Sequence, residues 1–278
     1  MATTRLLDDA DLGAVRRLLA DDPVAGCLIA TRVEAAGVDP RRLGAELWGY
    51  DTGADRLDGL CLSGANLVPL SDSASALAGF AERAAAQGRR CSSIVGVEHA
   101  VDAVWTQLAG VWGPARDVRA GQPLLAVSER PSLPPDPDVR VVVPAELDIL
   151  MPACVAMFTE EVGVSPVGPD GGRGYRGRVR ELIGAGRAFA RIEGGEVVFK
   201  AELGAVSSRA CQIQGVWVRP DRRGQGIGAA GTAAVVAAAL DSVAPVVSLY
   251  VNDYNEQALR AYRRVGFRQV NTFMTVLF

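Results

Sequence analysis

Residues 212–228 constrain this chain more than any other stretch. They begin with a segment that reads as a buried strand, pass through the basic turn 219–223, and enter an alanine-rich helix through alternating glycines. The first backbone N–H groups of a helix have no partner inside it, and the helix dipole there favours anions. Glycine lets a ligand approach the backbone closely. This stretch therefore predicts a strand–turn–helix unit that holds a phosphorylated ligand.

Three kinds of phosphate loop place glycines in such a position. A Walker A loop requires Lys and then Ser or Thr after its last glycine, and Ala229 and Ala230 are incompatible with it. The Rossmann pattern is met formally by Gly224, Gly226 and Ala229, but it needs a tight turn near the front of a long parallel sheet. The longer turn and the short remaining chain disfavour it. The third kind is the loop that binds the pyrophosphate of coenzyme A.

Composition argues against several other functions. The chain has 278 residues, 49% of them hydrophobic, which suits two domains. A formal net charge of −3 gives no reason to expect a nucleic-acid partner. The single histidine argues against a histidine-based triad or a multi-histidine metal site, and no metal is expected. Scattered cysteines, no signal-peptide pattern and no apolar run of about 20 residues predict a cytoplasmic protein without a membrane partner.

Four prolines within residues 130–138 mark the clearest boundary in the chain. Proline removes a backbone donor and fixes φ, so we expect an extended spacer between domains at 1–129 and 139–278. Each half shows two helical stretches, three strands, a helix, a strand, a helix and a strand-rich tail, the last tail being strands 267–270 and 272–278. This order favours a duplication with one degenerate half; the alternative is two unrelated α+β domains.

Two motifs in the C-terminal half resemble those of the GNAT family of N-acetyltransferases. The family's pyrophosphate motif, Gln or Arg followed by x-x-Gly-x-Gly or Ala, is matched by Arg223, Gly226 and Gly228. The family's downstream pattern is matched by Asn255, Ala258, Tyr262 and Gly266-Phe267. The first half lacks both motifs, so the layout is similar to that of two-domain actinobacterial GNAT proteins with a degenerate N-terminal domain.

The resemblance implies an α+β fold of tandem GNAT-like domains, each a mixed, mostly antiparallel sheet flanked by helices. In the C-terminal domain, the strands 212–218 and 246–251 would run parallel and splay apart. The pantetheine arm of acetyl-CoA would enter the gap and pair with the backbone as an added strand does. The implied coenzyme contacts are Val216, Trp217, Val218, Arg223, Gly224, Gln225, Gly226, Ile227, Gly228, Ala229 and Asn255.

The resemblance also implies transfer of an acetyl group from acetyl-CoA to a primary amine by direct attack in a ternary complex. A backbone N–H, expected to be that of Val218, would polarise the thioester carbonyl. Tyr262 would protonate the departing thiolate. The acceptor would be a small molecule or a peptide. Three roles stay open for the N-terminal half: a lid, a homodimer surface, or a second ligand pocket.

The general base is less evident from the residues. Gln212 and Gln214 occupy the strand on which many relatives carry a glutamate, and neither can act as a base. Glu202 on the preceding strand is the candidate by position, with an outward-facing strand residue as the alternative. Glu160 and Glu161 end a helix and could select a cationic acceptor, although helix-end glutamates are commonly only solvated.

Structural roles also stay open for three of the residues assigned to the site. They are an N-cap for Asn255, a core position for Tyr262 and a packed indole on the outer face for Trp217. Since no base is evident on the strand 212–218, a non-catalytic acyl-CoA-binding or regulatory protein is the rival prediction.

Overall fold

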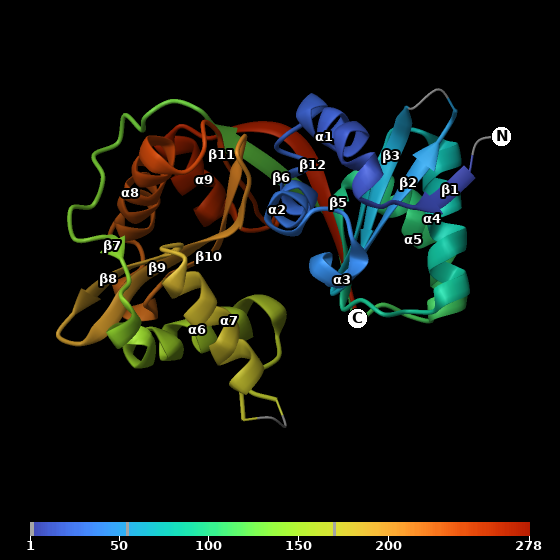
Figure 1. Ribbon diagram of the computed structural model, residues 1–278. Coiled ribbons are helices and arrows are strands. Elements are labelled where there is room, and N and C mark those ends of the chain that lie inside the picture. Colours follow the sequence, from blue (N-terminus) through green and yellow to red (C-terminus); the bar gives the residue numbers. More distant parts are fainter. Residues whose placement is uncertain (1–2, 54–55, 169–170) are drawn as a thin grey trace. The chain divides into compact units, whose positions relative to one another are not determined.

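The computed structural model describes residues 3–53, 56–168 and 171–278, which form two compact units. Unit 1 contains residues 1–125, 250–254 and 269–278; unit 2 contains 126–249 and 255–268. Both are α+β, and in both a mixed sheet is flanked by helices (Figure 1). Among the described residues, no helix is long and apolar enough to cross a membrane.

Unit 1 has a helical layer on each face of its sheet. The strand order is β1-β2-β3-β4-β5-β12-β6. One core packs α1 and α2 against the sheet, and another packs α4 and α5 against the opposite face. Its elements are β1 (Thr3–Leu6), η1 (Asp9–Asp11), α1 (Leu12–Asp21), α2 (Cys27–Ala36), α3 (Pro40–Leu43), β2 (Glu46–Asp51), β3 (Leu57–Ser63), β4 (Asn66–Leu70), α4 (Ala74–Gln87), β5 (Ser93–Val97), α5 (Glu98–Trp112), β6 (Asp117–Val127) and β12 (Arg268–Leu277).

The last strand of the chain belongs to the sheet of unit 1. β12 pairs antiparallel with β5, from Phe273 opposite Val97 to Leu277 opposite Ser93. The hydroxyl of Thr275 donates to the Gln122 side chain of β6 at 2.7 Å. The expectation of two terminal strands, 267–270 and 272–278, is wrong, because one continuous strand is formed. The grouping also differs from the contiguous halves expected from the prolines.

Unit 2 has the strand order β11-β10-β9-β8-β7. Helices α6 and α7 pack on one face of this sheet, where they share a core with Trp217. The other face carries α8, which lies so close that a Cβ at Gly231 would meet the Phe199 ring at 2.8 Å. Its elements are β7 (Arg140–Val141), η2 (Pro144–Glu146), α6 (Leu147–Val162), α7 (Arg173–Gly184), β8 (Ala188–Glu193), β9 (Glu196–Val206), β10 (Cys211–Val218), η3 (Pro220–Arg222), α8 (Ile227–Ser242), β11 (Val247–Tyr250) and α9 (Glu256–Val265).

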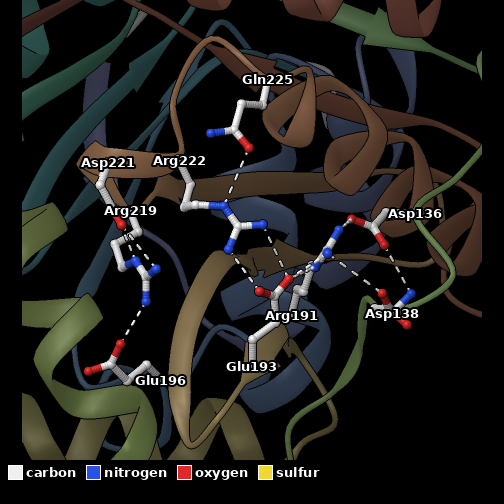
Figure 2. A network of polar contacts seen from close by, with 9 residues as sticks. All are labelled: Asp136, Asp138, Arg191, Glu193, Glu196, Arg219, Asp221, Arg222 and Gln225. Carbon is white, nitrogen blue, oxygen red and sulfur yellow. Dashed lines mark hydrogen bonds and ion pairs between the residues drawn. The ribbon is translucent and has the colours of Figure 1, made fainter.

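The proline-rich stretch 130–138 is irregular in backbone and tied to unit 2. The N–H of Asp136 donates to the Ala230 carbonyl of α8 at 3.0 Å. The buried Asp136 carboxylate accepts a hydrogen bond from Arg191 of β8 at 2.9 Å (Figure 2). The stretch is therefore anchored at its middle to both a helix and a strand.

Candidate functional site

A bulge in β10 separates this strand from its parallel neighbour. β10 pairs with β11 only at Cys211 and Gln212. Its register with β9 shifts between Gln214 and Trp217, and Gly215 within this bulge has φ of 57°. After the bulge, the N–H of Arg219 bonds Val198 on β9. Because neighbouring residues alternate in an antiparallel ladder, the N–H and C=O of Val218 then point away from β9.

The turn after β10 delivers a helix start with open backbone donors. Gly224 and Gly226 adopt positive φ of 76° and 81°. Gly226 is the N-cap of α8, and no side chain caps the helix there. The first bond within the helix runs from the N–H of Ala230 to the carbonyl of Gly226. The three preceding N–H groups of the helix therefore have no partner within it.

These parts surround one pocket of about 490 Å³. Every residue assigned to the coenzyme from the sequence lines it, apart from Gln225. The pocket also takes in Tyr262 and other residues of α9, together with Glu160 of α6. The post-bulge strand, the bare helix start and the α9 face thus converge within unit 2.

Tyr262 and Asn255 reach the pocket from α9. The Tyr262 side chain is buried, and its ring meets that of Phe267 edge-on at 6.0 Å between centroids. Burial, and secondarily the charge of Glu161, raise the pKa of the Tyr262 phenol well above its ordinary value. The phenol therefore carries its proton at neutral pH. Asn255 caps α9 by accepting from the N–H of Ala258 at 3.1 Å, while it also lines the pocket.

Residues 170–267 match the family model described as the acetyltransferase (GNAT) family. This segment is a GNAT-family domain. Residues 45–150 match a second family model, described as a domain of unknown function (DUF4081). No curated protein matches the chain.

Solved structures share the whole tandem fold. A Drosophila protein from a structural genomics consortium covers 100% of this chain and 99% of its own, with a TM-score of 0.68 and 14% identity. The match to a GNAT-family acetyltransferase from Colwellia psychrerythraea covers 99% of both chains, with a TM-score of 0.57 and 13% identity. The match to a tandem GNAT protein from the clavulanic acid biosynthesis pathway covers 100% of this chain and 98% of that protein, with a TM-score of 0.50 and 15% identity. The chain thus has the α+β fold of tandem GNAT-like domains, a fold that supports acyl transfer in general.

In the GNAT domain, Glu202 lies beside the bulge and outside the set of pocket-lining residues. Its carboxylate is 3.0 Å from the buried Lys200 ammonium and 3.8 Å from Arg178. Burial alone would lower the pKa of Lys200, but Glu202 and Cys154 raise it, and the net shift is upward. Lys200 therefore stays charged. Gln214 on β10 pairs with Glu202 on the neighbouring β9, so this part of the two strands is polar.

The arginines around the phosphate loop of the GNAT domain are held by carboxylates. Arg219 contacts Glu196 and Asp221, each at 2.7 Å. Arg222 bonds Glu193 at 2.7 Å, and Glu193 is shared with Arg191 of β8 (Figure 2). Both arginines are thus already engaged by carboxylates.

Several residues that line the pocket are not predicted from the sequence. Gln257, Arg260, Ala261 and Arg264 come from α9. Gln257 and Arg264 each lie three or four positions from Arg260 and Ala261, so the four share one helix face. None lies three or four positions from Tyr262, so the tyrosine gave no signal for them. Glu160 was considered only for an acceptor, and nothing in the sequence could place it here, 63 positions from Arg223.

Unit 1 lacks the features that open the pocket of the GNAT domain. β4 pairs with β3 in continuous register from Leu60 opposite Leu70 to Ser63 opposite Leu67. At the start of α4, the Ser73 hydroxyl accepts from the N–H of Ala76. His99 lies 3.1 Å from the Asp72 carboxylate at the same turn. The helix start of unit 1 is therefore self-capped and flanked by an acid.

Proposed function

We propose that this protein transfers an acetyl group from acetyl-CoA to a primary amine, by direct attack in a ternary complex. One observation carries the proposal: the freed backbone of Val218, the bare start of α8 and the Tyr262 side chain all border one pocket. The extended pantetheine arm of acetyl-CoA can pair with the open backbone edge of β10, as an added strand does. Phosphates fit the N–H groups of Ile227, Gly228 and Ala229.

Residues of the chain would stabilise each change of charge in the reaction. The amine nitrogen forms a bond to the acyl carbon, and the carbon–sulfur bond breaks. The N–H of Val218 would donate to the carbonyl oxygen as it becomes an oxyanion. Tyr262 would pass its proton to the departing thiolate, which is a reasonable acceptor at a pKa of about 8.5 to 10. The proton lost by the amine would pass to a base, for which we propose Glu202 beside the bulge.

A second candidate function is supported by the surroundings of Glu202. Its carboxylate is paired with Lys200, and the strand opposite carries Gln214. The carboxylate also lies outside the set of pocket-lining residues. The same pocket would then serve a non-catalytic acyl-CoA-binding or regulatory protein.

Thiol release from acetyl-CoA with a panel of small and peptide amines separates the two functions. The enzyme proposal expects turnover that falls sharply in Tyr262→Phe and Glu202→Gln while coenzyme binding persists. Equal turnover in wild type and Tyr262→Phe would remove this tyrosine from the mechanism. Coenzyme binding without turnover of any amine would favour the second function.

For the other half, we propose a degenerate GNAT-like domain at 1–129, to whose sheet β12 also belongs, that binds no coenzyme. The stretch 130–138 would join it to the catalytic domain that begins at residue 139. We also propose a cytoplasmic location, since five scattered cysteines without CxxC spacing suit a reducing compartment. No metal enters the proposed chemistry. A homodimer is compatible with it and is tested by sedimentation.

A further inference from the structure

Glu160 in the last turn of α6 closes a contact across the pocket of the GNAT domain. One carboxylate oxygen accepts from the Arg223 guanidinium at 2.7 Å, and the other accepts from the Trp217 indole at 3.1 Å. All three residues line the pocket. The carboxylate therefore occupies the one arginine that belongs to the phosphate motif.

The same contact also involves the strand edge. Arg223 donates through Nε to the carbonyl of Val218 at 3.0 Å. That carbonyl belongs to the open backbone edge of β10 after the bulge. With one end of its guanidinium on Glu160 and Nε on Val218, Arg223 spans the path between strand edge and helix start. Carboxylates and phosphates bind guanidinium by the same forked geometry, so they compete for it.

We propose that Glu160 is an internal competitor for Arg223, which lowers coenzyme affinity and couples coenzyme binding to the end of α6. This inference rests on the proposed coenzyme site. When a pyrophosphate takes Arg223, Glu160 loses that contact and Val218 loses its side-chain donor. The carboxylate keeps the indole N–H of Trp217 and becomes available for a cation.

An ordinary surface ion pair would give a different pattern. The side chains of Glu160 and Arg223 are 46% and 41% exposed. Pairs this exposed contribute little to stability, so Glu160→Gln should leave the thermal midpoint nearly unchanged. Loss of a competitor should instead change the affinity for the ligand. When a site is closed most of the time, its apparent affinity equals the affinity of the open site multiplied by the fraction that is open.

Calorimetric titration with coenzyme A tests this at physiological salt. We expect Glu160→Gln to bind coenzyme A about 5- to 10-fold more tightly than wild type, as for a contact closed about 80–90% of the time. Glu161→Gln removes the same charge from the same helical turn but leaves the contact between Glu160 and Arg223 in place. It should bind within about twofold of wild type, since exposed charges are screened by salt. The affinities of the three proteins for inorganic pyrophosphate should follow the same order as their affinities for coenzyme A.

A double-mutant cycle with Arg223→Gln makes the test specific. In the Arg223→Gln background, Glu160→Gln should no longer raise the affinity. Equal or weaker binding by Glu160→Gln in the wild-type background would overturn the inference, and so would an equal gain in Glu161→Gln. If wild type binds no coenzyme A at all, the proposed function fails; if it binds and Glu160→Gln is unchanged, only this inference fails.

Discussion

The Lys200 ammonium lies 3.0 Å from the Glu202 carboxylate, in the part of β9 that faces the bulge of β10. A Cβ at Gly215 would come within 2.9 Å of the Lys200 nitrogen, so the bulge and the ion pair fit around each other. The side chains of Lys200 and Glu202 are only 2% and 12% exposed. Removal of one partner of such a pair leaves the other charge buried without its nearest counter-charge.

Lys200→Met should therefore destabilise the protein by about 3 kcal/mol, measured by urea denaturation. Glu202→Leu combined with Lys200→Met should recover most of that loss, since the remaining pair is apolar. Wild-type stability in the single variant would show that Glu202 finds other compensation, such as Arg178 at 3.8 Å.

Gly226→Ala should weaken coenzyme A binding by tenfold or more, because a Cβ at the N-cap faces the helix start that we assign to the pyrophosphate. Gly226 has φ of 81°, so the change should also cost about 1 kcal/mol of stability. Gly195→Ala is the matched control: it has φ of 82°, also with open space around its Cβ position. Titration and thermal unfolding of both variants should show similar stability losses and a binding defect in Gly226→Ala alone.

The raised pKa of Tyr262 predicts an alkaline loss of stability. The unfolded phenol ionises near pH 10, and the folded one ionises only above that. The unfolded state therefore binds fewer protons above pH 10, so stability is intact below this pH and falls as pH rises toward the folded pKa. Unfolding followed between pH 9 and 11 should show a shallower loss in Tyr262→Phe. The same slope in wild type and variant would contradict this, and Tyr254→Phe, an exposed tyrosine, should follow wild type.

One coenzyme A should bind per chain. The start of α8 is bare, whereas the start of α4 is capped by Ser73 and lies beside Asp72 and His99. A calorimetric stoichiometry near one is expected for wild type, and Gly226→Glu should abolish the binding entirely. A stoichiometry near two, or binding that survives this variant, would assign a site to unit 1.

Local sequence signals were sufficient where the structure is itself local. Alternating glycines at 224–228 imposed positive φ before a helix, and the observed helix begins at Ile227. The Gly194–Gly195 pair likewise predicts the hairpin of β8 and β9, in which both glycines have positive φ. The resemblance supplied the splay of the strands, which the short pairing of β10 with β11 agrees with.

Contacts between distant segments could not be predicted in the same way. The pairing of β12 with β5 joins residues about 180 positions apart, and no periodicity within either strand encodes its partner. Arg223 belongs to the phosphate motif, but nothing in the sequence pairs it with Glu160, and only the folded chain brings the two together. The short β1 and α3 were also not predicted, because a segment of four residues shows too little hydrophobic periodicity to be recognised.

A crystal structure of the chain with acetyl-CoA tests the central claim most directly. We expect the pyrophosphate on the N–H groups that begin α8, the thioester oxygen within hydrogen-bond reach of the Val218 N–H, and the Tyr262 hydroxyl beside the sulfur. Acetyl-CoA bound elsewhere, or bound here with Tyr262 turned away from the sulfur, would contradict the assignment of this pocket to acyl transfer.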